Sequence, residues 1–180
     1  MVRTVGIVVF LGLALKLSLA SMPTDPLPIN EHLRVFEPLL GKTFRGEFAD
    51  STPDKPKHDV SHWERAMNGQ AVRVLHSIND GIYGGETIMM WDSSNKTIAY
   101  WYFTTAGFHT EGTMAVDGNQ WTSTEKVLGN ANGITEVQAT SQLTPDGQLH
   151  VRSKYLSKGQ WEKGHEIKYL PSPESKVTFK

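Results

Sequence analysis

From residue 68 onward, short turn-forming segments recur about every 8–12 residues along the chain. Asn-Gly and Asp-Gly pairs favour the left-handed backbone of tight hairpin turns. The stretches between the turns are rich in aromatic and β-branched residues, which favour strands. The turn segments are Asn68-Gly69, Asn79-Asp80-Gly81, residues 92–95, Ala106-Gly107, Asp117-Gly118-Asn119, residues 130–133, Pro145-Asp146-Gly147 and Lys158-Gly159. This spacing leaves no room for crossover helices, so it argues against a parallel sheet and indicates antiparallel hairpins.

The stretches between the turns predict an all-β fold of about ten strands. A sheet made of consecutive hairpins removes its exposed edges most simply by closing into an antiparallel up-and-down barrel. The expected strands are residues 43–48, 57–67, 70–78, 83–91, 97–105, 108–116, 120–128, 134–143, 148–156 and 160–169.

One short helix is expected before the first strand. Asn30 can cap its first turn, and Gly41 would end it. The residues expected on its buried face are Leu33, Phe36, Leu39 and Leu40. The predicted barrel domain therefore covers residues 30–170, and the C-terminal tail, residues 171–180, either adds a last strand or hangs free.

The first 20 residues have the organisation of a cleaved signal peptide. Arg3 supplies a positive start, residues 5–15 are apolar, and Ala20 ends a segment that a signal peptidase can cut. The apolar run is too short for a membrane-spanning helix, which needs about 20 apolar residues. We therefore expect a secreted or periplasmic protein that begins at Ser21 and has no integral membrane span after cleavage. An uncleaved membrane anchor is the alternative.

The composition limits the classes of partner and of stabilising bond. The chain contains no cysteine, so the exported protein must be stabilised by its core without disulfide bonds. Its 18 Lys and Arg residues are balanced by 19 Asp and Glu residues, which argues against a nucleic-acid partner. Removal of residues 1–20 takes away Arg3 and Lys16 and shifts the net charge from −1 to −3. Residues 21–29 contain three prolines and are expected to form an exposed leader.

Residues 39–47, with the sequence LLGKTFRGE, resemble the opening of the calycin-like barrels, the lipocalin-like and nitrobindin-like domains. In those domains a glycine and an aromatic residue begin the first strand. The closer resemblance is to bacterial exported lipocalin-like proteins, and it extends over about residues 39–169. The other segments that carry it are Asn68-Gly69, Trp91-Asp92, residues 104–107 and Gly112-Thr113.

A ligand-holding barrel needs a mostly apolar interior with a few polar groups that orient the ligand. Both faces of residues 97–105 carry bulky side chains, which is consistent with a lined cavity. We therefore expect the protein to bind a small hydrophobic molecule. The residues predicted to contact it are Arg73, Glu86, Tyr100, Trp101, Tyr102, His109 and Glu111. For the charged members, the alternative is a ladder of ion pairs between neighbouring strands.

Two other functions remain open from the sequence. A cofactor-free isomerase or cyclase would use His109 as a base with Glu111, because the pKa of histidine lies near neutrality. That function requires both side chains to face a closed cavity. An envelope interaction module would instead have a solid core and an exposed aromatic patch.

The motifs predict no cofactor, because the chain has no phosphate-binding loop, no nucleophile elbow and no His-Glu-x-x-His segment. His62 and His76, on neighbouring strands, could bind a metal with Glu64 or Glu86, but an offset of one residue would put the two histidines on different faces. The nitrobindin-like resemblance implies haem ligation by a histidine near the C-terminal strands. Its position corresponds to His165 here, with His150 as the alternative.

Overall fold

The structure, a computed structural model, describes residues 27–129 and 132–180. The predicted signal peptide, residues 1–20, and most of the predicted leader lie outside the described residues. Within the described part, the chain forms ten strands. They are β1 (Lys42–Phe48), β2 (His58–Ala66), β3 (Ala71–Ile78), β4 (Tyr83–Asp92), β5 (Thr97–Thr104), β6 (His109–Asp117), β7 (Gln120–Leu128), β8 (Ile134–Leu143), β9 (Leu149–Ser157) and β10 (Gln160–Pro171).

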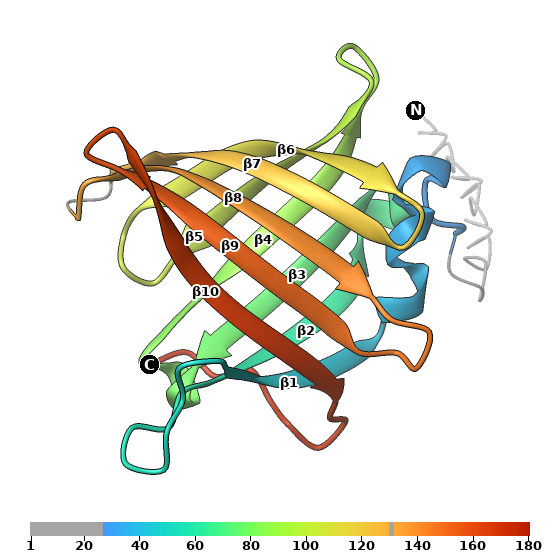
Figure 1. The fold of residues 1–180 in the computed structure, drawn as a ribbon. Coiled ribbons are helices and arrows are strands. Elements are labelled where there is room, and N and C mark those ends of the chain that lie inside the picture. The colour runs from blue at the N-terminus through green and yellow to red at the C-terminus, as the bar shows by residue number, and fades with distance from the viewer. Residues whose placement is uncertain (1–26, 130–131) are drawn as a thin grey trace, which may run out of the picture.

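Each strand pairs in antiparallel fashion with its neighbours in the sequence, and β1 closes the barrel by pairing with β10 (Figure 1). The prediction of an all-β up-and-down barrel is therefore confirmed. Every expected strand is present, and its ends differ from the predicted ones by at most two residues. This agreement follows from the hairpin turns, which fix where each strand must stop.

The backbone of the predicted turns explains their residue types. Asn68 and Gly69, in the short 3₁₀ turn η2 (Met67–Gly69), have φ angles of 54° and 86°. Asp80 and Gly81, in the turn η3 (Asn79–Gly81), have φ angles of 58° and 95°. Glycine, asparagine and aspartate adopt this left-handed conformation more readily than other residues.

A 3₁₀ helix, η1 (Glu31–Leu39), lies across one end of the barrel (Figure 1). As predicted, Asn30 caps it, and its side chain accepts a 3.0 Å hydrogen bond from the main-chain N–H of His32. The side chains that η1 buries are Leu33, Phe36 and Leu39. Their spacing of three residues matches the three-residue period of a 3₁₀ helix. Leu40 was predicted on the same face but is only half-buried, because it already lies beyond the last turn.

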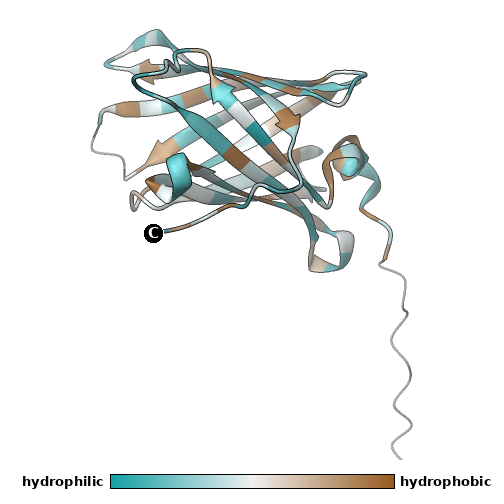
Figure 2. Ribbon diagram, turned by 90° about the horizontal axis from the view of Figure 1, so that it is seen from below, coloured by the Kyte–Doolittle hydropathy of each residue, from teal (hydrophilic) through white to brown (hydrophobic). Residues whose placement is uncertain are grey.

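The packed core lies at the η1 end of the barrel. The Phe36 ring centroid is 5.8 Å from that of Trp63 on β2 and 5.3 Å from that of Trp121 on β7. Other buried members of this cluster are Leu33, Leu39, Phe44, Val72, Met89, Ile98 and Leu149. Along the strands, hydrophobic and hydrophilic residues interchange (Figure 2), because successive side chains point to opposite faces of the sheet.

The segments on either side of the barrel pack against it to different extents. Leu27 is exposed, but Ile29 is buried in the core, so the predicted leader is not exposed to its end. In the tail, the Thr178 main-chain N–H donates a 3.0 Å hydrogen bond to the Ser77 hydroxyl, yet the tail forms no strand within the described residues. No helix in residues 27–129 or 132–180 is long and apolar enough to cross a membrane.

Candidate functional site

A cavity of about 1090 Å³ extends through the barrel from the core at the η1 end to the loops at the other end. All ten strands contribute to its wall. Trp63 and Trp121 form part of its floor, and Phe48, Ala106 and Phe108 lie near its mouth. The volume is slightly above the usual range for small-molecule sites, roughly 300–1,000 Å³.

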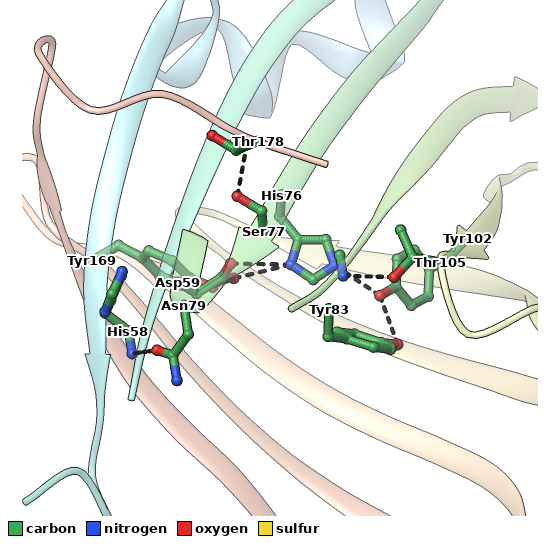
Figure 3. A network of polar contacts seen from close by, with 11 residues as sticks. His58, Asp59, His76, Ser77, Asn79, Tyr83, Tyr102, Thr105, Tyr169 and Thr178 are labelled. Carbon is green, nitrogen blue, oxygen red and sulfur yellow. Dashed lines mark hydrogen bonds and ion pairs between the residues drawn. The ribbon is translucent and has the colours of Figure 1, made fainter. Parts of the chain in front are cut away.

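A chain of polar groups centred on His76 crosses the cavity wall (Figure 3). His76 Nδ1 lies 3.1 Å from each carboxyl oxygen of Asp59, and its Nε2 lies 2.7 Å from the Tyr102 hydroxyl. The Tyr102 hydroxyl is in turn 2.9 Å from that of Tyr83. Both ring nitrogens of His76 are in contact with a polar group, Nδ1 with Asp59 and Nε2 with Tyr102. The chain therefore connects the imidazole ring of His76, on β3, to side chains of three other strands, β2, β5 and β4.

Asp59 is buried, with 3% of its surface exposed, and it also accepts a 2.6 Å hydrogen bond from the Tyr169 hydroxyl. A buried carboxylate needs such partners to offset the loss of water. Burial, followed by the charge of Asp59, raises the pKa of Tyr169 well above its usual value of 10. Burial and the contact with Tyr83 raise the pKa of Tyr102. These phenols are therefore neutral hydrogen-bond donors at physiological pH.

A second interior carboxyl belongs to Glu125, on the inward face of β7. Its Oε2 accepts a hydrogen bond from the Thr110 hydroxyl, and it also interacts with the Tyr100 hydroxyl. The register explains the second contact: Gly112 on β6 pairs with both Tyr100 and Glu125 and has no side chain to separate them. Burial raises the pKa of Glu125 above its usual value, because its partners are neutral hydroxyl groups.

His165, on β10, also faces the cavity, and its Nδ1 contacts the Tyr155 hydroxyl. Its main-chain N–H donates a 3.0 Å hydrogen bond to the Ser153 hydroxyl, near the bulge where the β9–β10 register shifts. Burial lowers the pKa of His165, so the ring is neutral at physiological pH. A neutral imidazole can accept a hydrogen bond or bind a metal through a ring nitrogen.

Of the residues predicted to contact a ligand, Tyr100 and Tyr102 do line the cavity. Arg73 and Glu86 do not, and their predicted place on the cavity wall is wrong. Arg73 Nε donates to Glu86 at 2.8 Å and its Nη1 donates to Glu64 at 2.8 Å, so these side chains form the ion-pair ladder that was the alternative. The reason is strand alternation: Val74 and His76 face inward, so Arg73 faces outward.

Trp101, His109 and Glu111 also lie on the outer surface, contrary to the prediction. Trp101 is 38% exposed and lies between two inward-facing tyrosines on β5. On β6, Thr110 faces the cavity, so its neighbours His109 and Glu111 face solvent. The acid–base pair in a closed cavity that the isomerase function requires therefore does not form from these two residues.

His62 and His76 do not lie close together as a metal site would require. His76 pairs directly with Ser61, and His62 pairs with Leu75, so the one-residue offset is present and puts the two histidines on opposite faces. His62 instead contacts the Thr43 hydroxyl at 2.9 Å on the outside. Within the described ranges, no three His, Asp or Glu side chains are arranged to hold a metal ion.

The sequence reasoning missed several residues of the cavity wall, above all Asp59, Glu125, Tyr155 and Tyr169. A signal for Asp59 was available, because it alternates with Ser61 and Trp63 on one strand. The bulky tryptophan marks that face as inward. For Glu125 the sequence offers no such signal. Its neighbours are threonine, serine and lysine, and such a segment is typical of a solvent-facing strand.

No protein-family model matches the chain, and no curated protein matches it. Among solved structures, that of Rv2717c from M. tuberculosis is similar, with a TM-score of 0.60 and 13% sequence identity. The similarity covers 80% of this chain and 99% of that chain. At this identity it shows a shared barrel fold and does not carry a ligand or an activity over. The finer resemblance to exported lipocalin-like and nitrobindin-like proteins stays a prediction.

Proposed function

We propose that this protein binds a small, mostly apolar molecule inside the barrel. The observation that carries the proposal is the cavity of about 1090 Å³, which all ten strands enclose. A barrel that served only as a structural module would fill this space with side chains, as close packing is the rule in protein interiors. Here the rings of Phe36, Trp63 and Trp121 pack together at the η1 end, and the cavity lies beyond them.

The chemistry of the wall supports the same function. Aromatic and aliphatic side chains dominate it, including Trp63, Tyr100 and Trp121. A few polar groups stand among them, including the hydroxyls of Tyr102 and Tyr169. Such groups can orient a mostly apolar ligand.

The first test is to ask whether the purified protein carries or takes up a molecule. Native mass spectrometry of the protein from its own host should show a bound mass, and an environment-sensitive naphthylamine dye should gain fluorescence on titration. If neither a bound mass nor saturable dye binding is found, the proposal is wrong.

A pair of neighbouring substitutions on β7 tests whether the dye binds inside the barrel. Ser123 faces the cavity, whereas Thr122 is exposed on the outer face. Ser123→Phe should fill part of the cavity and weaken dye binding, while Thr122→Phe should leave it unchanged. Equal effects of the two variants would mean that the dye binds elsewhere.

Haem is a second candidate ligand, and it depends on one observation: His165 faces the cavity as a neutral imidazole. With Nδ1 in contact with Tyr155, the other ring nitrogen is the one that could bind iron. Titration with hemin should then give a shifted Soret band that His165→Ala abolishes. A missing shift, or one that survives the substitution, removes haem from consideration.

We also propose that the protein is exported, on the pattern of residues 1–20 alone. Cell fractionation of the native host, with determination of the N-terminal residue, tests this directly. A secreted or periplasmic chain that begins at Ser21 is expected. A chain that retains residues 1–20 in the cytoplasm would contradict it.

A further inference from the structure

The charged side chains around the cavity are distributed unevenly between the mouth and the interior. At the mouth, Lys57 forms an ion pair with Asp50, and Lys163 is exposed. Glu166 pairs with Arg152 at 2.9 Å. No arginine lines the described part of the cavity, and Lys57 and Lys163 are its only lysines. The interior is therefore without a permanently cationic side chain.

Two carboxyl groups nevertheless lie in that interior. Asp59 is matched by His76 and Tyr169, which contact both of its oxygens. Glu125 has no histidine partner of this kind, because it contacts the hydroxyl groups of Thr110 and Tyr100. Within the described residues, no positively charged side chain lies beside Glu125 in the interior.

The surroundings of Glu125 are aromatic. Four tyrosines line the wall close enough to experience its charge, and they are Tyr83, Tyr100, Tyr102 and Tyr155. Burial raises the pKa of each of them, so they stay neutral. The face of an aromatic ring attracts a cation, and aromatic walls are a known means of holding ammonium groups.

We propose that the ligand of this cavity is an organic ammonium ion, a positively charged amine on an apolar body, and that its charged group binds at Glu125. The inference rests on the proposed ligand-binding function and narrows it to one chemical class. The apolar body would occupy the space between Glu125 and the tryptophan floor. A carboxylate ligand, such as a fatty acid, would meet the Glu125 carboxyl in an interior where no arginine or lysine of the described lining offsets the charge of the ligand.

The protonation of Glu125 gives this proposal a second signature. Burial favours the neutral acid, whereas an adjacent ammonium favours the carboxylate. Binding of the amine should therefore lower the pKa of Glu125 and release whatever fraction of a proton this carboxyl holds at the pH of the experiment. Calorimetry in buffers of different ionisation enthalpy measures that release, and a neutral ligand should not cause it.

The test compares three ligands with the same ten-carbon chain: decylamine, decanol and decanoate, each below its micelle concentration. Affinities are measured at pH 7 by displacement of the naphthylamine dye from the full-length chain. Decylamine should bind about tenfold or more tightly than decanol, as expected for a charge-assisted hydrogen bond. Decanoate should bind most weakly.

Two variants then assign the preference to one residue. Glu125→Gln keeps the shape of the side chain and removes its charge, so the advantage of decylamine over decanol and the proton release should both disappear. Unchanged decanol binding would show that the variant is folded. Glu86→Gln, in the outer ion pair, is the matched control and should behave like the unaltered protein.

The outcomes separate this inference from the proposed function. Equal binding of the three ligands, or a preference for decanoate, would overturn the amine inference and leave ligand binding standing. An amine preference that survives Glu125→Gln would also overturn it. If none of the three displaces the dye although the dye itself binds inside the barrel, the amine class is again excluded.

Discussion

The hydroxyl of Tyr169 on β10 donates a 2.6 Å hydrogen bond to Asp59 on β2, although β1 lies between these strands. Gly46 is the β1 residue in register with both of them. Because Gly46 has no side chain, the Tyr169 ring can pass over β1 and reach Asp59. A Cβ atom at Gly46 would lie 2.5 Å from Ile167 Cγ2 and 2.8 Å from Tyr169 Cδ1.

Gly46→Ala should therefore reduce the free energy of unfolding. The added methyl group must push the Tyr169 or Ile167 side chain aside, and overpacking of this kind costs about 1–3 kcal/mol. Urea unfolding followed by tryptophan fluorescence measures the change. Glu47→Ala, at the next and exposed position, should change stability by no more than about 0.5 kcal/mol. Equal stability of the two variants would show that the close approach at Gly46 is not important.

Tyr169→Phe removes a donor from a buried carboxylate and should also destabilise the fold. The expected loss is about 1.5–3 kcal/mol, because hydrogen bonds to charged groups exceed those between neutral ones. Tyr83→Phe is the comparison, since the Tyr83 hydroxyl is bonded to another hydroxyl. Its removal should cost about 0.5–1.5 kcal/mol. If the two variants unfold at the same urea concentration, the Tyr169–Asp59 hydrogen bond contributes no more to stability than the bond between the two hydroxyl groups of Tyr83 and Tyr102.

The features that the sequence predicts well are the ones that local chemistry determines. The cap at Asn30 and the turns at Asn68-Gly69 and Asp80-Gly81 need only their own backbone conformations. The strand lengths then follow from the turn spacing, and barrel closure follows from the number of hairpins. None of these conclusions requires knowledge of which face of a strand points inward.

The candidate site was predicted only in part, because it depends on that inward direction. Tyr100, Trp101 and Tyr102 are all bulky, so alternation separates them into two faces without saying which is inside. The structure places the tyrosines inside and leaves Trp101 on the surface. Glu125 becomes an interior residue only because strands from both ends of the chain enclose it, and a window of neighbouring residues does not contain that information.

Arg73→Met should test the outer placement of the ion-pair ladder. Arg73, Glu64 and Glu86 are each about one-third exposed, so solvent screens their attraction. The variant should lose about 0.5–1 kcal/mol of stability. It should bind the naphthylamine dye as the unaltered protein does, because its side chain is remote from the cavity. Weakened dye binding in a fully folded variant would contradict the outer placement.

Phe36→Ala should destabilise the protein strongly, since this side chain joins η1 to the barrel floor. It is completely buried and packs against Trp63 and Trp121. Truncation of a core phenylalanine costs about 3–5 kcal/mol. Arg34→Ala, at an exposed position of the same helix, is the control and should change the unfolding temperature little. Nearly equal unfolding temperatures would mean that η1 is not part of the cooperative fold.

The ionisation of Glu125 should make the free energy of unfolding depend on pH. Burial raises the pKa of Glu125 in the folded chain above the ordinary value of 4.5. Its contribution to stability is therefore complete below pH 4.5 and is lost as the pH rises through the folded-state pKa. Glu125→Gln cannot ionise, so it should become more stable relative to the unaltered protein as the pH is raised toward neutrality.

His165 should produce the opposite dependence. Burial lowers the pKa of His165 from 6.5, so its contribution is complete above pH 6.5 and is lost as the pH falls through the folded-state pKa. Urea unfolding of the unaltered protein, Glu125→Gln and His165→Gln between about pH 4 and pH 7.5 distinguishes the two groups. For Glu125→Gln, the difference in free energy of unfolding from the unaltered protein should change as the pH is raised above 4.5. For His165→Gln, that difference should change as the pH is lowered below 6.5. If the difference in free energy of unfolding between Glu125→Gln and the unaltered protein does not depend on pH, the Glu125 carboxyl is not buried. It would then lie on the outer surface, like the exposed acids.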